Sequence, residues 1–236
     1  MDGQAQIGRV SGIPIFVDYG FILLVLLWGH GYFTAGSPAV FMMGLWVVGG
    51  LALSIIVHEL AHAFAGRWYG IRTSGIEVNC CGGLCHLEKA APNPKADIVI
   101  LLAGPASNLA LWAVFSGLAY GIYELPDQFW RFEGVHWFGA VATTLASVNF
   151  AMFWFNLLPS HPLDGGRAMA AMMQGRLGRL RAMRIIAWSG MAVCGCLALA
   201  SAGAGMFTLF IAYHLYMHNQ QVLDTHRGPR LERLDK

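Results

Sequence analysis

Long apolar runs, separated by short polar segments, organise this sequence. A membrane-spanning helix needs about 20 mainly apolar residues, and five runs meet or approach that length; they lie at residues 13–28, 39–68, 98–123, 137–158 and 185–217. The last run is interrupted by the small residues 201–205. It is therefore either one long helix or two short helices joined by a tight turn.

Lysine and arginine residues distinguish these two alternatives, because they concentrate in cytoplasmic loops. They cluster in two segments between runs and in the tail, at residues 67–95, 167–184 and 227–236. The loops 30–38 and 124–136 contain a single one, Arg131. If the last run crosses twice, all of these cations except Arg131 lie on one side, with both termini cytoplasmic. We therefore predict an all-α bundle of six transmembrane helices, at residues 13–28, 39–68, 98–123, 137–158, 185–201 and 204–218.

Composition supports a multi-pass protein of the cell membrane, embedded in the lipid bilayer. Apolar residues make up 56% of the chain and charged residues 12%, against about 25% charged residues in a soluble domain. The apolar content excludes disorder, and the small number of charged residues argues against an ordinary soluble globule. The net charge of +2 is too small to indicate nucleic-acid binding. The start of the chain lacks a basic region followed by a small-residue cleavage site, so we expect no removable signal peptide.

Ionisable residues inside an apolar run are costly and usually functional. The second run contains the pattern H-E-x-x-H, from His58 through Glu59 to His62. On a helix the two histidines lie one turn apart on one face, where two imidazoles can bind one zinc ion. The adjacent Glu59 can serve as the general base for a zinc-activated water. A chance match is the alternative, but polar groups in lipid need one another or a metal.

A catalytic zinc ion needs a third protein ligand, and Asp164 is the best candidate. Two prolines break the helix before it, and the Gly165-Gly166 pair allows a close approach of the backbone. A helix-capping aspartate in a cytoplasmic loop is the alternative. His161, three residues earlier, either faces the site or is an ordinary loop histidine. The predicted topology puts the ends of the second and fourth spans on the cytoplasmic side, so these ligands can meet at one depth.

Residues 76–87 alternate partly in strand fashion, with Gly82-Gly83 as a turn signal, and predict a small membrane-associated β-hairpin after the second helix. Its exposed edge could pair with an extended substrate, which makes Gly82 and Gly83 candidates for substrate binding. His161 is a further candidate if it faces the site. A plain interfacial hairpin is the equal alternative.

Together these motifs resemble the site-2 protease family of intramembrane zinc metalloproteases, which is peptidase M50-like. The resemblance rests on four segments besides H-E-x-x-H: residues 12–15, Gly82-Gly83, A-G-P-A-S-N at 103–108 and N-L-L-P-S-H-P-L-D-G-G at 156–166. It implies one Zn²⁺ per chain, bound by His58, His62 and Asp164, with Glu59 as catalytic base. It also implies that Asn156 helps to hold the substrate or the oxyanion.

The resemblance implies a zinc metalloendopeptidase that cleaves transmembrane segments of membrane-anchored proteins, with its site open to the cytoplasm. The PDZ and CBS domains of some members have no counterpart here, so we expect one polytopic protease domain over residues 1–236. A divalent-metal binding or transport protein and a catalytically silent homologue are the alternatives. The sequence leaves open the substrate, its cleavage site, any regulatory membrane partner and a homo-oligomeric state.

Several other polar groups predict structure rather than chemistry. Asn108 is expected to satisfy backbone groups freed by Pro105. The His214 and His218 pair is expected to lie at the membrane interface. A cluster of thiols and one imidazole lies in the hairpin segment: Cys80, Cys81, Cys85 and His86. It lacks the C-x-x-C spacing of a second zinc site.

Overall fold

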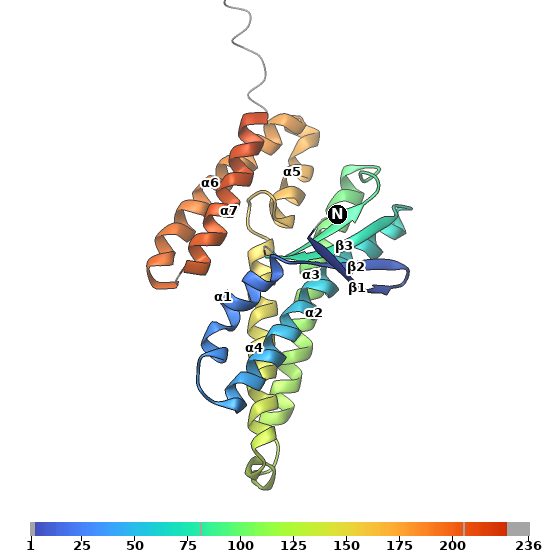
Figure 1. Cartoon of the computed structure of the whole chain (residues 1–236). Helices are drawn as coiled ribbons and strands as arrows, with labels where there is room; N and C mark the ends of the chain where they lie inside the picture. Colours follow the sequence, from blue (N-terminus) through green and yellow to red (C-terminus); the bar gives the residue numbers. More distant parts are fainter. Residues whose placement is uncertain (1–2, 81, 205, 226–236) are drawn as a thin grey trace, which may run out of the picture. The chain divides into compact units, whose positions relative to one another are not determined.

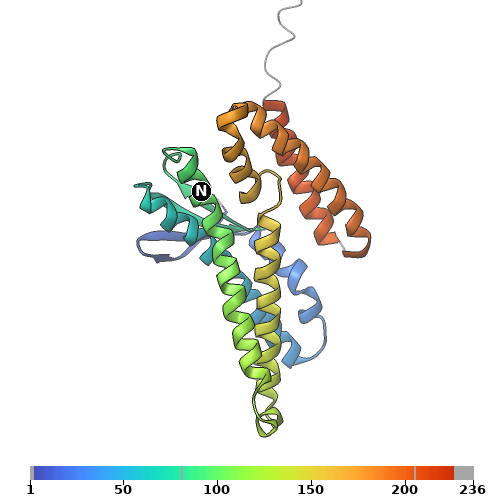
Figure 2. The same cartoon turned by 180° about the vertical axis from the view of Figure 1, so that it is seen from behind.

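The computed structural model describes residues 3–80, 82–204 and 206–225. Its helices are α1 (Phe21–Phe33), α2 (Pro38–Trp68), α3 (Pro94–Tyr123), the 3-10 helix η1 (Asp127–Arg131), α4 (Glu133–Asn156), α5 (Asp164–Leu177), α6 (Arg179–Ala204) and α7 (Met206–Thr225). Its strands are β1 (Gln4–Val10), β2 (Ile13–Asp18), β3 (Thr73–Asn79) and β4 (Gly82–Leu87). Figures 1 and 2 show these elements from two sides.

The chain divides into two compact units. The first comprises the chain up to Ala91 together with Ala103–Trp154, and the second comprises Pro92–Leu102 together with the chain from Phe155 onwards. The first unit therefore holds α1, α2, the strands and most of α3 and α4. The second holds α5, α6 and α7.

Four helices in the described part of the chain are long and apolar enough to cross a membrane: α2, α3, α4 and α6. The protein is thus a multi-pass membrane protein. The helices α2, α3 and α4 coincide closely with the predicted spans 39–68, 98–123 and 137–158. α6 and α7 confirm that the last apolar run forms two helices. The predicted bundle of six spans is confirmed only in part, because α1 has 13 residues and α7 is not among the four.

The predicted first span, residues 13–28, is wrong at its start. Residues 13–18 form β2, in which Ile13 and Ile15 are buried while their neighbours are partly exposed. This period of two is typical of a strand with one buried face. Asp18 then ends the strand, since its Oδ1 accepts a hydrogen bond of 2.7 Å from the Gly20 N–H, and α1 begins at Phe21.

The predicted hairpin at 76–87 is confirmed as β3 and β4, but it is half of a larger sheet. The strand order is β1-β2-β3-β4, with β2 parallel to β3 and the other pairs antiparallel. The sheet's contacts with α2 bury Ile13 and Ile76 against Leu60 and Ala63. An all-α description therefore omits an element that lies directly on the helix of the H-E-x-x-H pattern.

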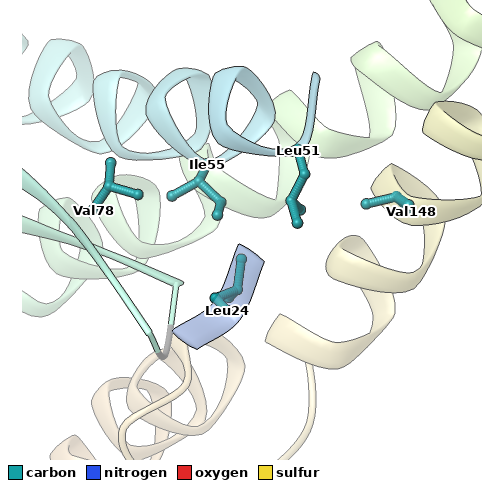
Figure 3. Close-up of a cluster of buried hydrophobic side chains, with 5 residues drawn as sticks. All are labelled: Leu24, Leu51, Ile55, Val78 and Val148. Carbon is teal, nitrogen blue, oxygen red and sulfur yellow. The ribbon is translucent and has the colours of Figure 1, made fainter. Parts of the chain in front are cut away.

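A second apolar cluster joins the sheet to three helices of the first unit. Its members come from α1, α2, β3 and α4 and are Leu24, Leu51, Ile55, Val78 and Val148 (Figure 3). Farther along, α3 and α4 lie side by side (Figures 1 and 2), and the rings of Trp112 and Phe150 pack with their centroids 5.4 Å apart. This packing fixes α2 beside α3 and α4.

In the second unit the sequence did not predict α5, which begins at Asp164 directly after the proline-containing loop. Gly178, with a φ of +78°, separates α5 from α6, as expected for a glycine after a helix end. Of the predicted break at 201–205, Ser201 to Ala204 belong to α6. Gly205, Cys81 and the basic tail at 226–236 lie outside the described residues.

Candidate metal centre

His58, Glu59 and His62 form a buried group on α2, as the pattern predicts. One ligand atom from each lies within 4.8 Å of the others, and no other group of three or more His, Cys, Asp or Glu residues among the described residues could hold a metal. The two Nε2 atoms are 3.1 Å apart, and the rings meet edge to face at 81°. Spacing by four residues on one helix produces this pairing.

This geometry fits zinc. Two imidazole nitrogens bound tetrahedrally at about 2.0–2.1 Å lie about 3.3 Å from one another, close to the observed 3.1 Å. Gly104 on α3 lies against the two rings, and an added Cβ there would overlap the Nε2 atoms of both histidines. The absent side chain keeps the metal-binding edge of the two rings clear.

A chain of hydrogen bonds holds His58 from behind. Its Nδ1 lies 2.5 Å from the Oδ1 of Asn108, whose Nδ2 donates to the Oδ1 of Asn149 at 3.0 Å. The Nδ2 of Asn149 donates in turn to the Ser54 hydroxyl and to the carbonyl of Leu145. Asn108, Asn149 and Ser54 are almost completely buried.

The two ends of this chain set its direction. The Ser54 hydroxyl donates to the carbonyl of Gly50, and a backbone carbonyl only accepts. Asn149 must therefore present its NH₂ group to Ser54 and Leu145, and its oxygen to Asn108. The oxygen of Asn108 then faces His58, so Nδ1 carries the proton and the lone pair of Nε2 points toward the metal position.

The interpretation of Asn108 as a partner for backbone freed by Pro105 is therefore wrong: its side chain bonds to His58 and Asn149. Asn149 was not identified at all. The position of Asn149 inside an apolar run could have indicated it, because an amide there needs a hydrogen-bond partner as much as an ionisable group does.

Removing the amide of Asn108 is expected to weaken zinc binding. Partners that orient a metal-binding histidine typically contribute 10–100-fold in affinity, so we expect Asn108→Ala to lower zinc affinity by about 10–100-fold. Competition with a chromogenic chelator in detergent measures this. The control is Ser107→Ala, which removes a hydroxyl bonded to the Gly104 carbonyl on the same helix. Equal affinities in Asn108→Ala and the wild type would exclude the orienting role.

Glu59 lies against the edge of the sheet. A Cβ added to Gly83 on β4 would come within 2.5 Å of both Cγ and Oε1 of Glu59. Gly82, beside it, has a φ of +123°, which glycine adopts readily. The Gly82-Gly83 pair thus lets the backbone of a strand approach the predicted catalytic base.

The other predicted site residues belong to the second unit. Asn156 is the last residue of α4, His161 is buried in the following loop, and Asp164 is the buried first residue of α5. The N-cap of α5 is Leu163, so Asp164 is not the cap. Cβ atoms on Gly165 and Gly166 would overlap the backbone of residues 157 and 160, which confirms the expected close approach. The roles of these residues in metal or substrate binding stay predictions.

Comparison with known proteins finds similarity to zinc metalloproteases. Residues 46–129 match the model of peptidase family M50. The "Putative zinc metalloprotease Rip3" of Mycobacterium tuberculosis is 33% identical over 205 residues, covering 79% of this chain and 50% of that protein. The "Zinc metalloprotease MJ0392" of Methanocaldococcus jannaschii is 27% identical over 189 residues, covering 79% and 50%. The chain thus spans about half the length of these curated relatives.

The fold matches a solved structure. The "Site-2 Protease from Methanocaldococcus jannaschii" aligns with a TM-score of 0.66 and 22% identity, over 92% of this chain and 94% of that one. Identity at this level indicates a shared fold.

Proposed function

We propose that this chain, which is similar to the site-2 proteases of peptidase family M50, is a zinc-dependent intramembrane endopeptidase. Its substrates are transmembrane segments of membrane-anchored proteins. The observation that carries the proposal is the buried His58–His62 pair, with Glu59 adjacent, on a helix long and apolar enough to span a membrane.

Each predicted site residue has a separate role in the proposed hydrolysis. His58 and His62, with Asp164 as third ligand, would hold one zinc ion, and the bound ion would supply an activated water and polarise the peptide carbonyl. Glu59 accepts a proton from the attacking water and delivers it to the leaving amine. Asn156 donates to the developing oxyanion or holds the substrate.

A transmembrane substrate must unwind before it is cut, because a helix hides its amides in its own hydrogen bonds. The outer edge of β4 offers an alternative set of backbone partners. β4 is the last strand of the sheet, and a substrate strand paired along it would extend the sheet. The contact between Gly83 and Glu59 would place that strand beside the base, with Gly82 and His161 as further candidate contacts.

The distribution of charge supports an orientation with both termini and the site's opening on the cytoplasmic side. All lysine and arginine residues except Arg131 then lie on that side, as the positive-inside rule expects.

A divalent-metal carrier is the rival function, since it would use the same ligands. Glu59 favours a hydrolase, because a carrier has no need of a carboxylate beside the first histidine. The deciding experiment reconstitutes the full chain in liposomes with a single-span reporter protein and follows cleavage by mass spectrometry. Zinc binding with no cleavage of any of several reporter segments would support the carrier.

Metal removal should stop cleavage. We expect dialysis against 1,10-phenanthroline to abolish reporter cleavage, because no other group of three or more His, Cys, Asp or Glu residues among those the structure describes could hold a metal. Stoichiometric Zn²⁺ is expected to restore cleavage. Product formation in liposomes and zinc content by elemental analysis measure the two effects. A chelator selective for Ca²⁺ serves as the control. Full activity in metal-free protein would contradict a zinc mechanism.

A further inference from the structure

We propose that Asn219 of α7 is a positioning residue that holds the loop leading to Asp164. The inference rests on the proposed function in one respect, namely that Asp164 is a zinc ligand. Asn219 is completely buried, and it occupies the polar end of a helix whose sequence suggested no chemical role.

The amide of Asn219 pairs with both backbone groups of one loop residue. Its Oδ1 accepts from the N–H of His161 at 3.1 Å, and its Nδ2 lies 3.0 Å from the carbonyl of His161. The same Nδ2 lies 2.9 Å from the Ser160 hydroxyl and 2.7 Å from the carbonyl of Leu215 on its own helix. One side chain thus satisfies the loop as a neighbouring strand would.

Two neighbouring residues of α6, Ser189 and Gly190, help Asn219 to hold the loop. The Ser189 hydroxyl donates to the carbonyl of Pro159 at 2.7 Å, and a Cβ on Gly190 would overlap the amide of Asn219. The absence of a side chain at Gly190 therefore creates the space that Asn219 fills. We define the clamp as Ser189, Gly190 and Asn219.

The clamped residues connect to Asp164 through a tight turn. The N–H of Leu163 donates to the carbonyl of Ser160 at 3.0 Å, and the backbone of Ser160 packs against Gly166 in the first turn of α5. Ser160 is therefore held between Asn219 and the helix that begins at Asp164. A shift of Ser160 would move the start of that helix.

The loop needs such partners for a physical reason. Pro159 and Pro162 have no N–H and cannot continue a helix, so internal hydrogen bonds such as that from Leu163 to Ser160 cannot satisfy all of the loop's backbone groups. Unsatisfied backbone groups are costly to bury in an apolar surrounding. A side-chain amide from α7 both satisfies these groups and fixes their position.

The test compares Asn219→Ala with Gln220→Ala, a control at the neighbouring position of α7. Hydrogen exchange of peptides covering residues 157–163 reports on the loop directly. We expect exchange at the His161 amide to rise about tenfold in Asn219→Ala, because its acceptor is removed, and to stay unchanged in the control. Gly190→Ala, which displaces the same amide, and Ser160→Ala, which removes one contact, are expected to act in the same direction and serve if Asn219→Ala does not fold.

A second readout separates positioning from stability. Zinc affinity of Asn219→Ala should fall about tenfold, and the visible spectrum of the Co²⁺-loaded variant should shift toward that of Asp164→Asn. Unchanged exchange in Asn219→Ala and Gly190→Ala would overturn the clamp. Faster exchange with wild-type zinc affinity, while Asp164→Asn binds weakly, would overturn the positioning role. Wild-type zinc affinity in Asp164→Asn would instead refute the third ligand of the proposed function, and the exchange data would still decide the clamp.

Discussion

Replacing Glu59 with glutamine is expected to lower the rate of peptide cleavage by about 10²–10⁴-fold, the usual contribution of a general acid–base group. The amide has nearly the same shape but cannot accept a proton from water. Glu59 is buried against Gly83, so an isosteric side chain should retain the packing. Zinc content should stay at the wild-type level, because the predicted ligands are untouched. Single-turnover cleavage of the reporter and elemental analysis of the same sample measure both effects.

The matched control is Glu88→Gln, which neutralises an exposed carboxylate just after β4 and should cleave at the wild-type rate. Loss of zinc from Glu59→Gln would show that the carboxylate contributes to metal binding. Cleavage at an undiminished rate with zinc bound would contradict Glu59 as the base and the proposed mechanism with it.

Replacing Gly104 with alanine is expected to weaken zinc binding by about 100-fold or more and therefore to abolish cleavage. This effect exceeds the usual effect of removing a residue that orients a metal ligand without binding the metal. The new methyl group would overlap the Nε2 atoms of both histidines, the atoms proposed to bind the ion. Packed interiors accommodate such an overlap only by moving side chains or backbone. Isothermal titration of the metal-free protein with Zn²⁺ measures the affinity.

Gly117→Ala is the matched control, because it makes the same change on α3 at a position where an added Cβ meets nothing within 4 Å. Alanine is the better helix former, so this variant should be at least as stable as the wild type and bind zinc normally. Wild-type affinity in Gly104→Ala would mean that the histidines bind the metal from another direction.

The parts of the site that the sequence predicted are those determined by local geometry. His58 and His62 are four residues apart on one helix, and the helix alone brings them together. Asn108 and Asn149 are 41 residues apart, and their contact depends on how α3 packs against α4. Sequence spacing carries no information about such a contact, so the sequence does not predict the hydrogen-bond chain behind His58. The same reasoning explains why Asn219 was not singled out.

The errors in the fold have similar causes. The length and apolar character of residues 13–28 predict a span, although Ile13 and Ile15 already show the period of a strand. β1 is mostly exposed and has little apolar alternation to reveal it. α5 was missed because two glycines in its first turn suggest a loop, whereas here they allow the helix to start against residues 157 and 160.

The parallel pairing of β2 with β3 couples the sidedness of two distant segments. Ile15, Phe16 and Val17 are in register with Ile76, Glu77 and Val78, and strands joined by backbone hydrogen bonds cannot be separated by a bilayer. The chain must therefore leave through α1 and return through α2 to the face from which it started. An impermeant thiol reagent applied to Ile7→Cys, made in a chain whose native cysteines are replaced, would report the orientation of the segment after α2 as well, because Ile7 is exposed on β1.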